Sequence, residues 1–200
     1  MAEDIARIFI AIELPVDVAR GLDRTILLLR ERVAAPDIKW VTAGNIHVTL
    51  KFLGDVPRAR IEEIGRSLEP ICAAAPLMRL SVAGLGAFPS PRAPRVVWAG
   101  LQGDIEPLSS LARSVDGALV ALGYPGESRP FTPHLTLARV RQEATGDVRS
   151  RLADVLLRAR MSQPLPFQAD SASIMRSQLT PRGAVYSRLA HLPFGSSPDQ

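Results

Sequence analysis

The sequence contains few of the residue types on which several common protein chemistries depend. Among its 200 residues it has one cysteine, two lysines and three histidines. The single cysteine, Cys72, cannot form an internal disulfide, and it falls within an apolar helical pattern where a small buried residue is expected. A chain without disulfides suits a reducing compartment, and we therefore expect a cytoplasmic location.

Long hydrophobic runs are also missing from the start of the chain. The first residues include the acids Glu3 and Asp4, and the apolar run that follows is interrupted by Glu13 and Pro15. This pattern predicts neither a secretory signal nor a membrane span. No glycine-rich phosphate loop precedes a predicted helix, so nucleoside triphosphate hydrolysis has no support.

Charge of one sign is in mild excess. The formal net charge is +4 and the isoelectric point is about 10.0, which favours an anionic partner such as nucleic acid or a phosphorylated metabolite. Almost all of the basic residues are arginine, whose planar group matches phosphate geometry. Base composition of the genome is a simpler explanation of this excess, so charge alone does not select a partner.

The spacing of apolar residues predicts strands that alternate with helices. Residues 5–14 alternate as a half-buried strand does, and Pro15 then begins a helix. Gly54 is expected to close the next strand, and residues 88–94 contain too many prolines for regular structure. Further strands are expected at about 46–53, 77–87, 95–101, 134–140, 166–175 and 184–190, and further helices at about 61–71, 108–122 and 147–160.

These elements predict an α+β fold rather than a doubly wound parallel sheet, because the closing strands can pair as hairpins. The hydrophobic content of 46% allows a real core. Two similar segments stand at comparable places in the two halves of the chain, so we expect one domain over residues 1–194, with two pseudo-repeated lobes that face each other across a cleft. Residues 195–200 are expected to form a disordered tail.

The two similar segments each contain a histidine two residues before a threonine, inside an aliphatic run. Residues 45–50 read Asn-Ile-His-Val-Thr-Leu and residues 133–137 read Pro-His-Leu-Thr-Leu. Side chains at i and i+2 of a strand point to the same side. His47 and Thr49 therefore share one surface, as do His134 and Thr136. One such segment could be an ordinary strand with a polar outer face, but two in one chain are hard to dismiss.

Two imidazoles and two hydroxyls across one cleft suit phosphoester chemistry. An imidazole titrates near neutral pH, so one histidine can act as a base while the other acts as an acid. The threonines can donate hydrogen bonds to the non-bridging phosphate oxygens, where negative charge must be held. Neither segment has a neighbouring cysteine or carboxylate to complete a zinc site, so we expect no metal and no cofactor. His191 has no threonine two positions on and is interpreted as structural.

These segments resemble the paired motifs of a known superfamily, the 2H phosphoesterases. The resemblance rests on residues 45–54, Asn-Ile-His-Val-Thr-Leu-Lys-Phe-Leu-Gly, and on residues 129–139, Arg-Pro-Phe-Thr-Pro-His-Leu-Thr-Leu-Ala-Arg. It extends to residues 7–15, 95–100 and 177–186, and it is greatest to the bacterial RNA 2′,3′-cyclic phosphodiesterases, also called 2′-5′ RNA ligases. The resemblance implies a bilobal α+β fold, with two antiparallel sheets that line a cleft and helices on the outside.

The resemblance also implies a reaction and its residues. It implies hydrolysis of a terminal 2′,3′-cyclic phosphate of RNA to a 2′-phosphomonoester, without metal or cofactor. His47 would donate a proton to the leaving 3′ oxygen and His134 would accept one from water; because the two segments are symmetric, the opposite order of these roles stays open. Thr49, Thr136 and Arg129 would bind the phosphate. The expected partner is an RNA end bearing a cyclic phosphate, bound by a monomer without membrane contact.

Phe9, on the first predicted strand, has two interpretations. It could stack on a base of the substrate, and an ordinary core contact fits its position equally well.

Three other readings of the same residues stay open. The site could join RNA ends through a 2′-5′ linkage, which is the reverse reaction. The protein could be a nucleotide-binding module without turnover, although binding alone would need only the hydroxyls and a cation. It could also act on a small cyclic nucleotide or on 2′-5′ oligoadenylate.

Overall fold

The computed structural model describes residues 4–161, 163–180 and 183–195. The paired strands are antiparallel, with helices packed against their sheet, so the expected α+β fold class is confirmed. The helices are α1 (Val16–Arg32), α2 (Ile61–Ala74), α3 (Ile105–Ala121) and α4 (Gly146–Arg158), with short 3-10 turns η1 (Ala43–Asn45) and η2 (Arg58–Arg60). The strands are β1 (Ile5–Glu13), β2 (Ile38–Trp40), β3 (His47–Pro57), β4 (Met78–Ser90), β5 (Ala93–Gly103), β6 (His134–Val140), β7 (Leu165–Ala169), β8 (Ser171–Thr180) and β9 (Gly183–Pro193).

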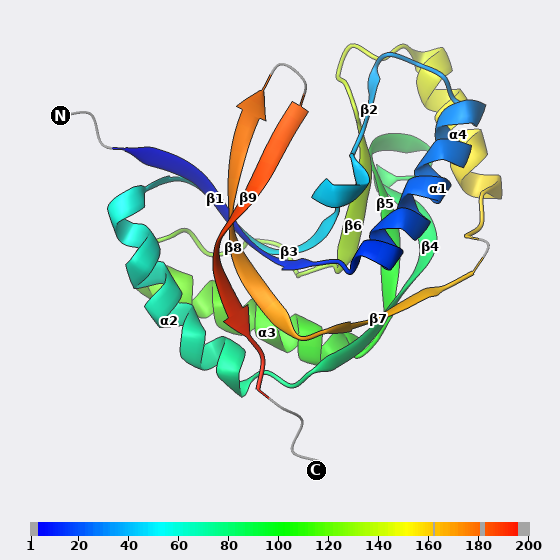
Figure 1. Cartoon of the computed structure of the whole chain (residues 1–200). Coiled ribbons are helices and arrows are strands. Elements are labelled where there is room, and N and C mark those ends of the chain that lie inside the picture. The colour runs from blue at the N-terminus through cyan, green and yellow to red at the C-terminus, as the bar shows by residue number, and fades with distance from the viewer. Residues whose placement is uncertain (1–3, 162, 181–182, 196–200) are drawn as a thin grey trace.

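The strands form one curled antiparallel path, in the order β7-β4-β5-β6-β3-β1-β8-β9, with β2 paired to β6. Two separate sheets were expected from the resemblance, and the structure instead joins the two halves at the centre. The join is narrow, because among the described residues β3 and β6 pair only at Val48 and Leu135. Beyond that point the halves diverge, as Figure 1 shows.

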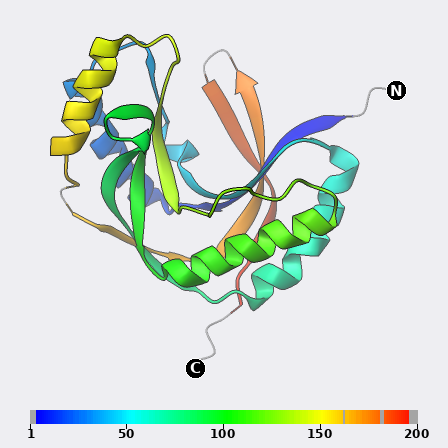
Figure 2. The ribbon, with the colours of Figure 1, turned by 180° about the vertical axis from the view of Figure 1, so that it is seen from behind.

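Each half of the sheet takes strands from both parts of the chain. On one side, β1 and β3 pair with each other and β8 adds to β1, while on the other side β5 and β6 pair with each other and β4 adds to β5. Helices α2 and α3 pack against the half that holds β3, β8 and β9, and α1 and α4 against the half that holds β4, β5 and β7 (Figures 1 and 2). If the chain were divided at its middle, each half of the sheet would therefore lose strands that the other part of the chain supplies.

The core lies between the sheet and these helices, and most of it follows the predicted spacing. Ile8, Ile10 and Ile12 are fully buried along one side of β1, and Leu22, Ile26 and Leu29, which recur at helical spacing in α1, are buried too. Cys72 on α2 is buried, as its helical pattern predicted, and burial raises the pKa of its thiol to about 11. None of the helices in the described ranges is long and apolar enough to cross a membrane.

The proline-rich segment was wrongly predicted to be irregular. Strands β4 and β5 continue through it, with Pro89 opposite Pro94 and Ser90 opposite Ala93, so that only residues 91 and 92 remain for the turn. Proline cannot donate to a ladder, but it is tolerated at bulges, and the register of this hairpin shifts between Phe88 and Pro89. Composition favoured a loop, whereas the pairing of two long strands decided the structure.

Other boundaries also differ from the predictions. Gly54 does not close β3, since the strand continues to Pro57. Its left-handed φ of 74° instead accommodates a register shift in the pairing of β3 with β1. The strand expected at 166–175 is two strands, since β7 pairs with β4 and β8 pairs with β1. Strand β2 was not predicted. The tail predicted to be disordered begins at Gly195, and residues 196–200 lie outside the described residues.

Candidate active site

The two His-x-Thr segments lie on the two central strands, β3 and β6, and meet where these strands pair. Val48 lies opposite Leu135 in an antiparallel arrangement. The positions beside this pair are therefore His47 next to Thr136 on one side, and Thr49 next to His134 on the other. Neighbouring strands are about 4.8 Å apart, so the four side chains surround a single crossing point.

A bulge follows the threonine in both strands and changes which side chains join this surface. Two consecutive residues of β1 pair with Thr49 and Lys51 of β3, so the pairing skips Leu50. In the same way, two consecutive residues of β5 pair with Thr136 and Ala138 of β6, so the pairing skips Leu137. One leucine in each strand, Leu50 or Leu137, is therefore the extra residue. Each bulge shifts the alternation by one position, so the next outward side chain is three residues after the threonine.

The outward side chains beyond the bulges are Phe52 and Arg139. Phe52 is 45% exposed, and both residues line the cavity beside His47. Strict alternation would have placed Arg139 on the buried side with Leu135 and Leu137, and it was not predicted as a site residue. A charged residue on that aliphatic side was the one sequence signal of the bulge. No such signal existed in β3, where strict alternation placed Lys51 outward and Phe52 inward without conflict.

Both imidazoles are held in the same way by the backbone. Nδ1 of His47 lies 2.8 Å from the carbonyl oxygen of Asn45, and Nδ1 of His134 lies 2.8 Å from that of Thr132. A carbonyl oxygen can only accept, so Nδ1 of each neutral ring carries the hydrogen. Nε2 of each ring then has a free lone pair for proton transfer.

Aromatic side chains pack against each histidine. Phe9 stacks on His47 with ring centroids 4.7 Å apart, and Tyr186 approaches the same imidazole edge-on at 5.3 Å. Phe88 meets His134 edge-on at 5.0 Å. These contacts restrict the orientation of both rings and remove part of the water around His47.

Burial lowers the pKa of His47 below its ordinary value near 6.5, because the charged imidazolium loses hydration. The hydrogen bond to the Asn45 carbonyl opposes this change, and so does the negative charge of Glu13. The positive charges of Arg139 and His134 lower the pKa further. His47 is therefore mostly neutral at pH 7.

A cavity of about 130 Å³ opens beside the crossing point. Thr49 and Thr136 line it, and neither hydroxyl makes a hydrogen bond within the described part of the chain, so both can donate to a ligand. The hairpin of β8 and β9 contributes Ser177 and Tyr186, and the Asn45 amide donates a 2.7 Å hydrogen bond to a carbonyl of this hairpin. The residues that line the cavity are Phe9, Val41, Asn45, His47, Thr49, Phe52, Thr136, Arg139, Ser177 and Tyr186.

The remaining predicted residues lie in different surroundings. His134 is beside Thr49 at the crossing and does not line the 130 Å³ cavity. Phe9 lines the cavity, but it is only 3% exposed, so most of its ring is covered by protein. Arg129 is exposed in the loop before β6 and is not among the cavity-lining residues. His191 is exposed on β9.

Metal chemistry would need a cluster of ligands. Over residues 4–161, 163–180 and 183–195, no group of three or more histidine, cysteine, aspartate or glutamate side chains is placed to hold an ion. The site instead combines two nitrogen bases, two hydroxyl donors and an arginine. Such a set can transfer protons and bind an anion without further groups.

Comparison with known proteins finds one family along almost the whole chain. The family described as LigT like Phosphoesterase matches residues 12–98 and residues 101–186, so each His-x-Thr segment lies in its own matched range. The RNA 2′,3′-cyclic phosphodiesterase of Methanothermobacter thermautotrophicus is 32% identical over 176 residues, which cover 87% of this chain and 93% of that protein. The protein of the same name from Aeropyrum pernix is 34% identical over 173 residues, covering 84% and 94%.

Solved structures are similar over the same length. TT0787 of Thermus thermophilus superimposes with a TM-score of 0.73 at 26% identity, covering 94% of this chain and 97% of that one. The similarity therefore includes both halves of the sheet and the crossing between them.

Proposed function

The chain belongs to the LigT-like phosphoesterase family, and from this premise we propose that it hydrolyses the terminal 2′,3′-cyclic phosphate of RNA to a 2′-phosphomonoester. The names of its relatives support the reaction. The observation that carries it in this chain is the crossing of β3 and β6, which brings two imidazoles and two free hydroxyls around one point. A binding module would have no use for two imidazoles held with Nε2 free.

In the proposed reaction, water attacks the phosphorus atom while a histidine accepts its proton. The bond from phosphorus to the 3′ oxygen breaks, and the other histidine protonates that oxygen. The products are a 2′-phosphate and a free 3′ hydroxyl. We assign the proton donor to His47 and the acceptor to His134, with Nε2 as the reacting atom of each.

The burial of His47 bears on this assignment. A donor must be protonated when the substrate is bound, whereas burial lowers the pKa of His47. The phosphate of a bound substrate acts in the opposite direction, since a nearby anion favours the charged imidazolium. If the phosphate effect is the smaller one, the two roles are exchanged, with His47 as the base.

The other polar residues are proposed to bind the phosphate. Thr49 and Thr136 would donate hydrogen bonds to the non-bridging oxygens, and Arg139 would add a fixed positive charge from the same surface. Arg129 is proposed to contact the substrate outside the cavity, because its side chain is exposed in the loop before His134.

Phe9 is proposed to hold the His47 ring in place. Its small exposure leaves little of the aromatic face for a base of the substrate.

The substrate and its setting are part of the proposal. We propose RNA ends bearing a cyclic phosphate as the substrate, and a monomer that acts in the cytoplasm. Ligation through a 2′-5′ linkage would use the same groups, with a 5′ hydroxyl of RNA in place of water as the attacking group and the 3′ oxygen again as the leaving group.

The direct test is incubation with nucleoside 2′,3′-cyclic phosphates and with short RNAs that end in one. The 2′- and 3′-phosphate products are resolved by chromatography. We expect the 2′-phosphate alone, faster from the short RNA. Absence of turnover on every substrate, with measurable binding, would support the nucleotide-binding module instead. A 3′-phosphate product would contradict the proposed leaving group.

A further inference from the structure

Lys51 is a buried charge that the proposed reaction does not use. It follows Thr49 by two residues, and its side chain is only 2% exposed. The bulge at Leu50 explains this position, because it turns Lys51 away from the active site and toward α3. A buried ammonium group is costly unless it is paired and hydrogen-bonded, so its partners must compensate for the lost hydration.

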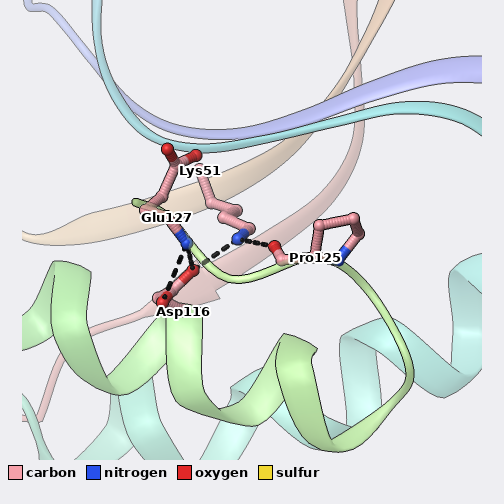
Figure 3. A network of polar contacts seen from close by, with 4 residues as sticks. All are labelled: Lys51, Asp116, Pro125 and Glu127. Atoms are coloured by element: carbon pink, nitrogen blue, oxygen red, sulfur yellow. Dashed lines mark hydrogen bonds and ion pairs between the residues drawn. The ribbon is translucent and has the colours of Figure 1, made fainter. Parts of the chain in front are cut away.

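The partners of Lys51 belong to the segment that leads to the second motif. Its amino group donates to the carboxylate of Asp116 on α3 and to the carbonyl oxygen of Pro125, as Figure 3 shows. The same carboxylate accepts hydrogen bonds from the backbone N–H of Glu127, at 3.2 and 3.4 Å. We call these four groups the Lys51 network.

The network fixes a loop that has no regular structure of its own. Residues 122–133 connect the end of α3 to His134, the first residue of β6. A second cation, Arg60, holds the start of this loop, since it donates to the Leu122 carbonyl at 2.9 Å and lies over the Tyr124 ring at 5.1 Å. Both cations follow the first motif in the sequence, and both bind the loop that precedes the second.

The end of the loop sets the orientation of a proposed catalytic group. His134 is held through the carbonyl of Thr132, which is part of the loop, so the path of the loop determines where the imidazole points. Arg129 lies on the same loop, between the network and His134. A displacement of about 1 Å at a reacting group can lower a rate by about 100-fold.

We propose that Lys51 and Asp116 are positioning residues, which set the path of residues 122–133 and through it the orientation of His134. They link the two His-x-Thr segments by contacts on the side of β3 opposite the substrate. The effect on the rate rests on the proposed function, whereas the hold on the loop does not.

The experiment separates positioning from simple loss of stability. Asp116→Leu leaves the buried ammonium group of Lys51 without its carboxylate and should lower the melting temperature strongly, whereas Lys51→Met leaves the 26% exposed Asp116 without its cation and should lower it less. The double variant Lys51→Met/Asp116→Leu removes both charges and should recover much of that stability, while the hydrogen bonds to the loop stay absent. Arg113→Met is the matched control, because Arg113 pairs with Glu106 on the exposed side of the same helix, at 2.8 Å.

Two readouts are compared at a temperature where each variant is folded. For the double variant we expect kcat on a nucleoside 2′,3′-cyclic phosphate to fall at least about 10-fold, with KM within about threefold of the wild type. Hydrogen exchange of the Glu127 amide should become at least about 10-fold faster, because its acceptor is gone. Arg113→Met should change neither quantity.

Several results would overturn the proposal. A double variant with wild-type kcat and wild-type exchange in residues 122–133 would mean that Lys51 and Asp116 only neutralise each other. In the wild type itself, exchange of the Glu127 amide as fast as that of an unprotected loop amide would show that the network does not hold the loop. If the wild type has no turnover, the proposed function fails, and the exchange experiment still decides the structural part.

Discussion

Replacement of Phe9 by alanine should change both the stability of the protein and the titration of His47. The Phe9 ring is 3% exposed and stacks on His47 at 4.7 Å, so alanine removes nearly all of a buried contact. Removal of a buried phenylalanine side chain costs about 3–5 kcal/mol of unfolding free energy. Phe9→Leu retains most of the apolar volume and should cost less than about 2 kcal/mol.

The effect on His47 has a definite sign. Burial is the main cause that lowers the pKa of His47, and a cavity left beside the ring admits water. The pKa should therefore rise toward 6.5 in Phe9→Ala, and rise less in Phe9→Leu. NMR titration of the His47 ring signals measures the pKa, and urea unfolding measures stability. An unchanged or lower pKa of His47 in a folded Phe9→Ala variant would refute burial as the cause.

Three further outcomes are expected. Arg139→Gln should lower kcat/KM on a nucleoside cyclic phosphate by about 10- to 100-fold, since it removes a charge-assisted hydrogen bond to the phosphate, while Arg129→Gln should lower kcat/KM less than about threefold. A larger loss in Arg129→Gln than in Arg139→Gln would mean that the phosphate binds at the loop before β6. Turnover should be unchanged in excess chelator, and activity that is lost to EDTA and restored by zinc or manganese would show a metal requirement. Because the pKa of His47 is lower in the folded state, the unfolded chain binds a proton first as the pH is lowered through about 6.5, and the unfolding free energy decreases. In His47→Gln the unfolding free energy should therefore decrease less steeply from pH 7 to pH 5 than in the wild type, and an equal slope would contradict the lowered pKa.

The alternation of polar and apolar residues in the sequence was enough to predict that the histidine and threonine of each His-x-Thr segment share one surface. In both segments the histidine and threonine face outward, and Val48, Leu50, Leu135 and Leu137 are buried. This succeeded because a strand has a period of two, and the core requires its apolar side. The same rule failed one residue later in each strand, because a bulge adds a residue without changing composition.

Contacts between distant parts of the chain were beyond local pattern. Arg139 reaches the cavity because of a bulge opposite β5, and the burial of Lys51 depends on partners about 65 to 74 positions away, on α3 and in the following loop. The strand expected at 166–175 divides because each part finds a partner in a different half of the sheet. Local propensity says little about which strands will pair over such separations.

The central claim is that both histidines act in catalysis, and single-residue variants test it most directly. Turnover of a 2′,3′-cyclic phosphate and affinity for the 2′-phosphate product are measured for the wild type, His47→Ala and His134→Ala. We expect each variant to lose at least about 100-fold in kcat, with product affinity within about threefold of the wild type, because proton transfer is lost while the threonines and Arg139 still bind the phosphate. Variants that keep wild-type kcat, or that lose affinity in proportion to kcat, would contradict two-histidine acid and base catalysis.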